Sequence, residues 1–149
     1  MKSLLDPAGN AEIINRINGL KPGLQPAWGK MNVTQMLGHC QQPMRVAYGE
    51  LKIKRGLLGF LFGKIAKKKL MSDTPMSKNL PTVKNFIMPD NLNFEEEKAK
   101  LIALVKRMAT EGASAISKDP HPLFGRMTIS EWDTLGWKHL DHHLQQFGV

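Results

Sequence analysis

Residues 128–147 constrain the fold most, because they predict a helix that carries two histidines on its buried face. Thr128 and Glu131 fit a capping box, in which each side chain bonds a free backbone N–H at the helix start, and Gly148 supplies a stop. Apolar residues recur every three or four positions, and the same row continues to His139 and His143. The other members of this row are Ile129, Trp132, Leu135, Gly136 and Phe147.

The two histidines of this row are four residues apart, so their Cβ atoms should lie about 5–6 Å from each other. A buried imidazole nitrogen without a partner costs about 1–3 kcal/mol, and one divalent metal would satisfy both rings. Alternatively, each ring could form a hydrogen bond with a neighbouring helix. The metalloprotease motif H-E-x-x-H is absent because Leu140 replaces the glutamate, and His142 points away from the row toward solvent.

A third histidine, His39, lies in a second predicted helix, which has Asn32 as its N-cap and an apolar face from Val33 to Ala47. Pro43 should kink this helix and free the carbonyl of His39, which makes His39 the natural third ligand beside an opened space. The alternative is that His39 faces solvent or bonds a local carbonyl. The residues that we expect around such a pocket are Met36, Pro43 and Trp132.

The single cysteine, Cys40, follows His39 directly. Neighbouring residues on a helix point about 100° apart, so the thiol and the imidazole do not face each other. We therefore expect Cys40 to be a small buried hydrophobe and not a nucleophile. One cysteine allows no intramolecular disulfide, which fits a reducing cytoplasm.

Two further helices and a long crossover complete the pattern. Pro7 opens the first helix and Gly19 ends it, while residues 94–109 form a helix with acidic residues in the first turn and basic residues later. Residues 72–93 are rich in turns and predict an irregular crossover, in which residues 83–88 are extended and could form a short strand. Long ordered loops are commonly functional, so this one could be a wall or lid over a site.

The segment from Lys52 to Lys69 is the most cationic part of the chain, and residues 56–69 are amphipathic. Such a pattern can lie on an anionic membrane surface or follow phosphates. Glycines at 56, 59 and 63 make it a poor helix in isolation, which favours packing against the domain with the lysines solvated. No nucleic-acid motif accompanies it, so nucleic-acid binding is not expected. The candidate anion-binding residues are Lys64, Lys67, Lys68 and Lys69, opposite the apolar Leu58, Leu61, Phe62 and Ile65.

Composition predicts one globular domain over residues 1–149, with 42% hydrophobic and 23% charged residues. No apolar run is long enough for a transmembrane helix, and the N-terminus lacks the apolar core of a signal peptide. A net charge of +8 favours anionic partners or surfaces. With helices on either side of a crossover and histidines on two of them, the pattern predicts an all-α four-helix bundle with an extra short helix, whose core could hold a metal.

Three segments resemble the DinB-like superfamily, which includes YfiT-like metal-dependent hydrolases and transferases, and more closely an uncharacterised branch of it. They are residues 32–40, the loop His121-Pro-Leu-Phe-Gly125, and residues 137–148. The resemblance extends from about Trp28 to the C-terminus.

This resemblance implies an up-up-down-down bundle, often a homodimer, with a divalent metal held by three histidines that match His39, His139 and His143. Many members carry arginine after the last histidine, where this chain has Leu144, so an anion-binding role there is not implied. His121, between two prolines, is a candidate for the second shell. Asp141 is the other candidate for the second shell, but it lies off the histidine face and is a poor candidate for a general base.

We consider three functions. The first is a metal-dependent enzyme in which zinc, nickel, iron or manganese activates a water or a low-molecular-weight thiol for hydrolysis or S-transfer on a small molecule. The second is a non-catalytic bundle that is stabilised by a metal or binds a ligand. The third is a protein that binds anionic surfaces through residues 64–69.

Overall fold

The computed structural model describes residues 2–54 and 56–149, without the side chains of residues 57–60, and this described part is all-helical with no strand. Arg55, which belongs to the cationic segment, and the side chain of Leu58, which was named above, lie outside the described residues. The elements, in chain order, are α1 (Pro7–Gly19), α2 (Val33–Ala47), α3 (Leu57–Met71), η1 (Lys84–Phe86), α4 (Phe94–Glu111), η2 (Gly112–Ala115) and α5 (Ile129–Gln146).

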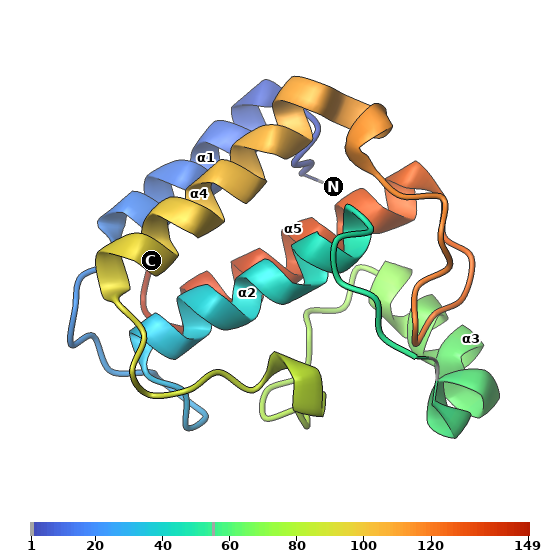
Figure 1. The fold of residues 1–149 in the computed structure, drawn as a ribbon, viewed down its shortest axis with the longest axis horizontal. Coiled ribbons are helices and arrows are strands. Elements are labelled where there is room, and N and C mark those ends of the chain that lie inside the picture. Colours follow the sequence, from blue (N-terminus) through green and yellow to red (C-terminus); the bar gives the residue numbers. More distant parts are fainter. Residues whose placement is uncertain (1, 55) are drawn as a thin grey trace.

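Helices α1, α4, α2 and α5 form a ring in which each packs against two neighbours (Figure 1). Their buried faces meet in one core of residues from all four helices, with Ile13, Met36, Val105 and Leu140 at most 1% exposed. The predicted helical bundle is therefore confirmed. Helix α3 lies outside the ring and packs against α5.

The hydrogen bonds at the two ends of each helix pair show whether the two helices run parallel or antiparallel. Asn10 bonds the carbonyl of Val105 while Lys98 bonds that of Asn18, so α1 and α4 are antiparallel. The other pairs follow from bonds at both ends: α2 runs parallel to α4 (Gln41 to Glu97, Tyr48 to Leu104), and α1 runs parallel to α5 (Leu4 to Asp133, Arg16 to Asp141).

The bundle is therefore up-down-down-up, and the expected up-up-down-down order is wrong. An up-up-down-down bundle needs two long crossovers, one within each half. This chain has one long connection, residues 48–93 between α2 and α4, and the shorter links join antiparallel neighbours in sequence. The single crossover thus places the parallel pair in the middle of the chain.

The predicted helix boundaries agree closely with the structure because the capping side chains act as expected. Asp6 accepts bonds from the first N–H groups of α1, and Asn32 and Thr128 both form capping boxes. Helix α2 continues without a break through Pro43. The short strand considered for residues 83–88 is absent there; a 3₁₀ turn, Lys84–Phe86, stands in its place.

Helix α3 is attached to the bundle by specific polar contacts. The Lys138 ammonium donates to the carbonyls of Leu70, Ser72 and Thr74 at 2.6–2.9 Å, which satisfies carbonyls at the C-terminal end of α3. Lys67 donates to the Arg126 carbonyl at 2.8 Å. None of the described helices combines the length and the apolar character needed to cross a membrane.

Candidate metal centre

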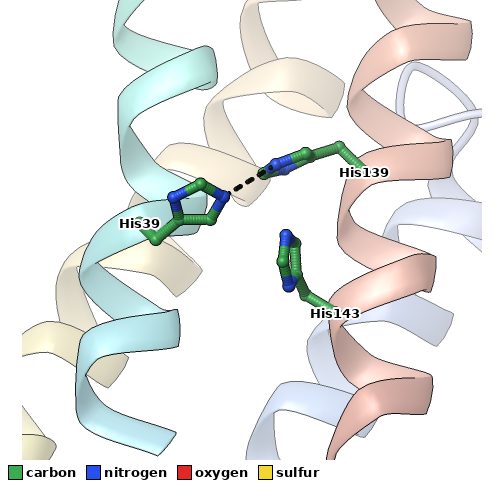
Figure 2. Close-up of side chains that lie close together, drawn as sticks. All are labelled: His39, His139 and His143. Atoms are coloured by element: carbon green, nitrogen blue, oxygen red, sulfur yellow. Dashed lines mark hydrogen bonds between the residues drawn. The ribbon is translucent and has the colours of Figure 1, made fainter. Parts of the chain in front are cut away.

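Two antiparallel helices bring three histidines together in the core. His39 comes from α2, and His139 and His143 come from successive turns of α5; Figure 2 shows all three rings pointing into the space between the helices. Each residue offers one nitrogen such that the three atoms lie within 4.8 Å of one another. The exposed fractions are 5% for His39, 9% for His139 and 8% for His143. The three histidines that the apolar periodicity selects in the sequence thus lie together in one cluster.

The rings are close but not stacked. Ring centroids are 5.0 Å apart for His39 and His139, 4.8 Å for His39 and His143, and 4.6 Å for His139 and His143. The shortest contact joins the Nε2 atoms of His39 and His139 at 3.1 Å (Figure 2). Two nitrogens that ligate one tetrahedral zinc at 2.0–2.1 Å lie about 3.3 Å apart, so this separation is near that of a shared ligand.

Neighbouring acceptors set the tautomers of two rings. His39 Nδ1 lies 3.1 Å from the carbonyl oxygen of Phe86, in η1. His143 Nδ1 lies 2.8 Å from Gln146 Oε1, and Gln146 is oriented by donating its Nε2 to the Trp28 carbonyl. Because both acceptors are oxygens, Nδ1 carries the hydrogen in each ring, and the Nε2 lone pairs of His39 and His143 are directed inward.

Burial keeps the three imidazoles neutral. Desolvation lowers the pKa of His39, lowers that of His139 well below its usual value, and lowers that of His143 to about 4. Repulsion between the rings adds to the shift in His139 and His143. Neutral imidazole is the form that ligates a metal, so these rings are ready to bind one at neutral pH.

The donor set fits a divalent transition metal. The Nε2 lone pairs of His39 and His143 both face His139. In the 3.1 Å contact between His39 Nε2 and His139 Nε2, the hydrogen must therefore belong to His139 when no cation is bound. A cation would replace that hydrogen and satisfy all three nitrogens at once. Within the described residues, the potential ligands grouped here are the three histidines alone, a set that suits zinc, nickel, iron or manganese with further positions left for other ligands.

The two residues considered for the second shell make their hydrogen bonds elsewhere. His121 Nδ1 accepts from the backbone N–H groups of Leu123 and Phe124 within its own loop. Asp141 pairs with Arg16 on α1 at 2.7 Å and accepts from Gln145. Instead, the ring N–H groups of the cluster are held by Gln146 and by the carbonyl of Phe86.

Sequence reasoning missed both of these partners. Gln146 stands three residues after His143, so its helical spacing was a usable signal. The carbonyl of Phe86 belongs to the crossover, and no sequence pattern specifies which backbone carbonyl of an irregular segment approaches a helix.

The residues expected to line a pocket are mostly core residues. Met36 is fully buried and Trp132 is 3% exposed. Cys40 is buried too, its thiol lies 3.6 Å from the Met36 sulfur, and burial raises its pKa, which agrees with a structural role. A cavity of about 100 Å³ lies instead beside His142, whose ring centroid is 5.1 Å from that of His143. It is lined by Trp28, Pro75, Met76, Lys78, Lys138, Asp141, His142 and Gln145.

The four candidate anion-binding lysines lie on α3, whereas the clustered histidines lie on α2 and α5. Lys64, Lys68 and Lys69 are exposed. Lys67 faces inward, where it forms a 2.8 Å ion pair with Glu131 at the start of α5. The structure thus separates this basic surface from the cluster.

One family model matches almost the whole chain: residues 2–148 match the model described as "Protein of unknown function (DUF1569)". No curated protein matches the chain significantly. No solved structure does so either.

Proposed function

The chain belongs to the DUF1569 family of unknown function, and from that premise we propose that it is a metal-dependent enzyme of the DinB-like superfamily. His39, His139 and His143 hold one divalent transition metal. The reaction is hydrolysis or S-transfer on a small molecule, with a water or a low-molecular-weight thiol as nucleophile. The observation that carries the proposal is the convergence of three neutral, buried imidazoles with oriented Nε2 atoms.

The chain's own residues bind and orient. Phe86 and Gln146 hold the N–H of one imidazole each, which fixes both rings and increases their basicity toward a metal. The core around the rings excludes water and so strengthens electrostatic interactions inside the site. When bound, the metal supplies Lewis-acid activation, which makes a water or thiol nucleophilic near neutral pH.

The resemblance to the DinB-like superfamily also supports a homodimer, which sedimentation velocity tests directly. The lone, buried cysteine is compatible with the cytoplasm as the compartment.

The first experiment measures the metal content of the purified protein by elemental analysis. We expect about one equivalent of a transition metal in the wild-type protein, and loss of that metal in a His143→Ala variant. His142→Ala is the matched control: it removes an imidazole from the same helix that lies against Trp28 and not in the cluster, and it should retain the metal.

Two results would contradict metal binding. One is absence of metal from the wild-type protein even after incubation with zinc, nickel and manganese. The other is equal metal content in the wild-type protein and the His143→Ala variant. Circular dichroism of each variant shows whether the helices are retained.

A non-catalytic, metal-stabilised bundle is the second candidate, and the burial of the site favours it. The three rings are at most 9% exposed, and the neighbouring cavity of about 100 Å³ is much smaller than a typical small-molecule site. The Co²⁺-substituted protein separates the two functions. An enzyme with an open position gains a thiolate-to-cobalt absorption band when a small thiol is added, whereas a closed structural site leaves the spectrum unchanged.

A further inference from the structure

Helix α3 presents an outward face that combines apolar and basic side chains. Leu61 is 56% exposed, Phe62 is 55% exposed and Ile65 is 71% exposed. The exposed Lys64, Lys68 and Lys69 stand on the same side of the helix, so the expectation from sequence that these lysines lie opposite the apolar residues is wrong. We call these six residues, Leu61, Phe62, Lys64, Ile65, Lys68 and Lys69, the α3 outer face. Large apolar side chains grouped on a surface mark a binding site.

The opposite side of α3 is fixed to the bundle, so the outer face has a defined orientation. Gly63 packs so closely on the Leu123 carbonyl that no side chain would fit there. Lys67, one turn later, bonds Arg126 and Glu131. Lys138 holds the carbonyls at the C-terminal end. The inner side of α3 is therefore held to the bundle by specific contacts, and α3 itself lies at the edge of the molecule (Figure 1).

Charge identifies the kind of partner. Residues 51–72 contain seven basic residues, Lys52, Lys54, Arg55, Lys64, Lys67, Lys68 and Lys69, and no acidic residue. We propose that the α3 outer face docks the protein on an anionic lipid bilayer, with Leu61, Phe62 and Ile65 entering the headgroup region and the lysines contacting acidic headgroups. Interfacial helices have this pattern, because long lysine side chains reach the headgroups while apolar neighbours are buried.

Two other occupants fit the face less well. A second copy of this chain, related by twofold symmetry, would place the α3 lysines of both copies against each other. A nucleic acid would satisfy the lysines but would leave the aliphatic Leu61 and Ile65 against phosphates. A bilayer alone satisfies both parts of the face.

The test is flotation of the full 149-residue chain with vesicles. We expect binding to phosphatidylcholine vesicles that contain about one third phosphatidylserine and no binding to pure phosphatidylcholine, with weaker binding as salt rises. The triple variant Lys64→Gln, Lys68→Gln and Lys69→Gln should bind about 100-fold more weakly, since each lysine near the surface contributes about fivefold.

Matched controls separate the outer face from net charge and from general apolar exposure. Lys21→Gln, Lys106→Gln and Lys118→Gln change the same charge at exposed lysines elsewhere and should leave binding nearly unchanged. Phe62→Ser with Ile65→Ser should reduce binding at least about tenfold, because a fully buried Phe or Ile contributes that much. Leu80 and Val83 are 56% and 51% exposed, and the double variant Leu80→Ser with Val83→Ser should bind vesicles as the wild-type protein does.

A fluorescent label adds a readout of insertion. An Ile65→Cys variant can be labelled selectively, because Cys40 is 1% exposed and unreactive. The emission of an environment-sensitive dye at this position should shift to shorter wavelength with anionic vesicles only.

Several outcomes would overturn the proposal. One is the absence of flotation with anionic vesicles at low salt, and another is an equal loss of vesicle binding in the triple variant of the control lysines. A third is binding to duplex nucleic acid that competes with vesicle binding and is unchanged by Phe62→Ser. Self-association that Ile65→Ser abolishes, without any lipid binding, would assign the face to a second copy. The His143→Ala variant should bind vesicles as the wild-type protein does, so this test is independent of the metal site.

Discussion

Gln146 connects the histidine cluster to the segment before α2. Its Oε1 accepts from His143 Nδ1, and its Nε2 donates to the Trp28 carbonyl before α2. We expect Gln146→Leu to weaken metal binding by 10–100-fold, roughly the effect of losing such a partner in other sites, because the His143 ring loses its fixed orientation. Competition with a chromogenic chelator measures the affinity.

Two variants make this result specific. Gln146→Glu keeps an acceptor for His143 and should retain metal affinity even though it loses the bond to Trp28. Gln145→Leu changes the exposed neighbour, which bonds Asp141, and should have no effect. Equal affinity in Gln146→Leu and the wild-type protein would contradict the role assigned to Gln146.

The three clustered histidines could be predicted from sequence because each stands on a helix, where spacing specifies direction. His139 and His143 follow from the apolar row of α5, and His39 from that of α2. His121 could not be placed in this way, since its loop sets its environment: the ring lies 5.1 Å from that of Trp132 and accepts bonds from its own loop. Residues in loops need tertiary contacts to be placed.

At the scale of elements, α3 depends on one glycine. A methyl group at position 63 would overlap the carbonyl oxygen of Leu123. We therefore expect Gly63→Ala to lift α3 from the loop before α5 and to speed hydrogen exchange of the α3 amides at least about tenfold. Intrinsic helix propensity predicts slower exchange instead, because alanine favours a helix by about 1 kcal/mol over glycine.

The sign of the change in exchange rate therefore decides between packing and propensity. Gly56→Ala, where the added methyl group meets open space, is the control and should not release the helix. Metal affinity should stay unchanged in Gly63→Ala, because the cluster lies on α2 and α5. Slower exchange in Gly63→Ala would show that this contact does not hold α3.

The elements themselves were predictable, but their directions were not. Capping side chains and apolar periodicity are local signals, and they gave the bounds of α1, α2, α4 and α5 within about two residues. The directions of the helices depend on which connection crosses the bundle. Which connection does so follows from how residues 48–93 pack against the helices. Its turn over His39 is held by nonlocal bonds, such as those from Gln35 to the Met88 carbonyl and to Asp90.

For the whole molecule, the buried histidines predict loss of stability in acid. Burial lowers the pKa of His143 and of His121 from 6.5 to about 4, and the pKa values of His39 and His139 are lowered too. The unfolded chain therefore binds more protons than the folded chain between pH 6.5 and about 4. The free energy of unfolding should be at its full value above pH 6.5 and fall as the pH drops through this window, by about 1.4 kcal/mol per pH unit for each histidine that stays neutral in the fold.

Metal should shift this curve in a defined way, because only neutral imidazoles bind. At neutral pH, zinc at about one hundred times its dissociation constant adds about 2.7 kcal/mol to the free energy of unfolding, which raises Tm by roughly 5–10 °C. This gain should persist at pH 5 and be lost as the pH falls toward 4, where the His143 imidazole of the folded protein becomes protonated, and it should be absent at every pH in His143→Ala. Thermal unfolding with zinc and with a chelator, across pH 4–8, measures both effects. A zinc-induced rise in Tm that persists in His143→Ala would place the metal elsewhere on the protein.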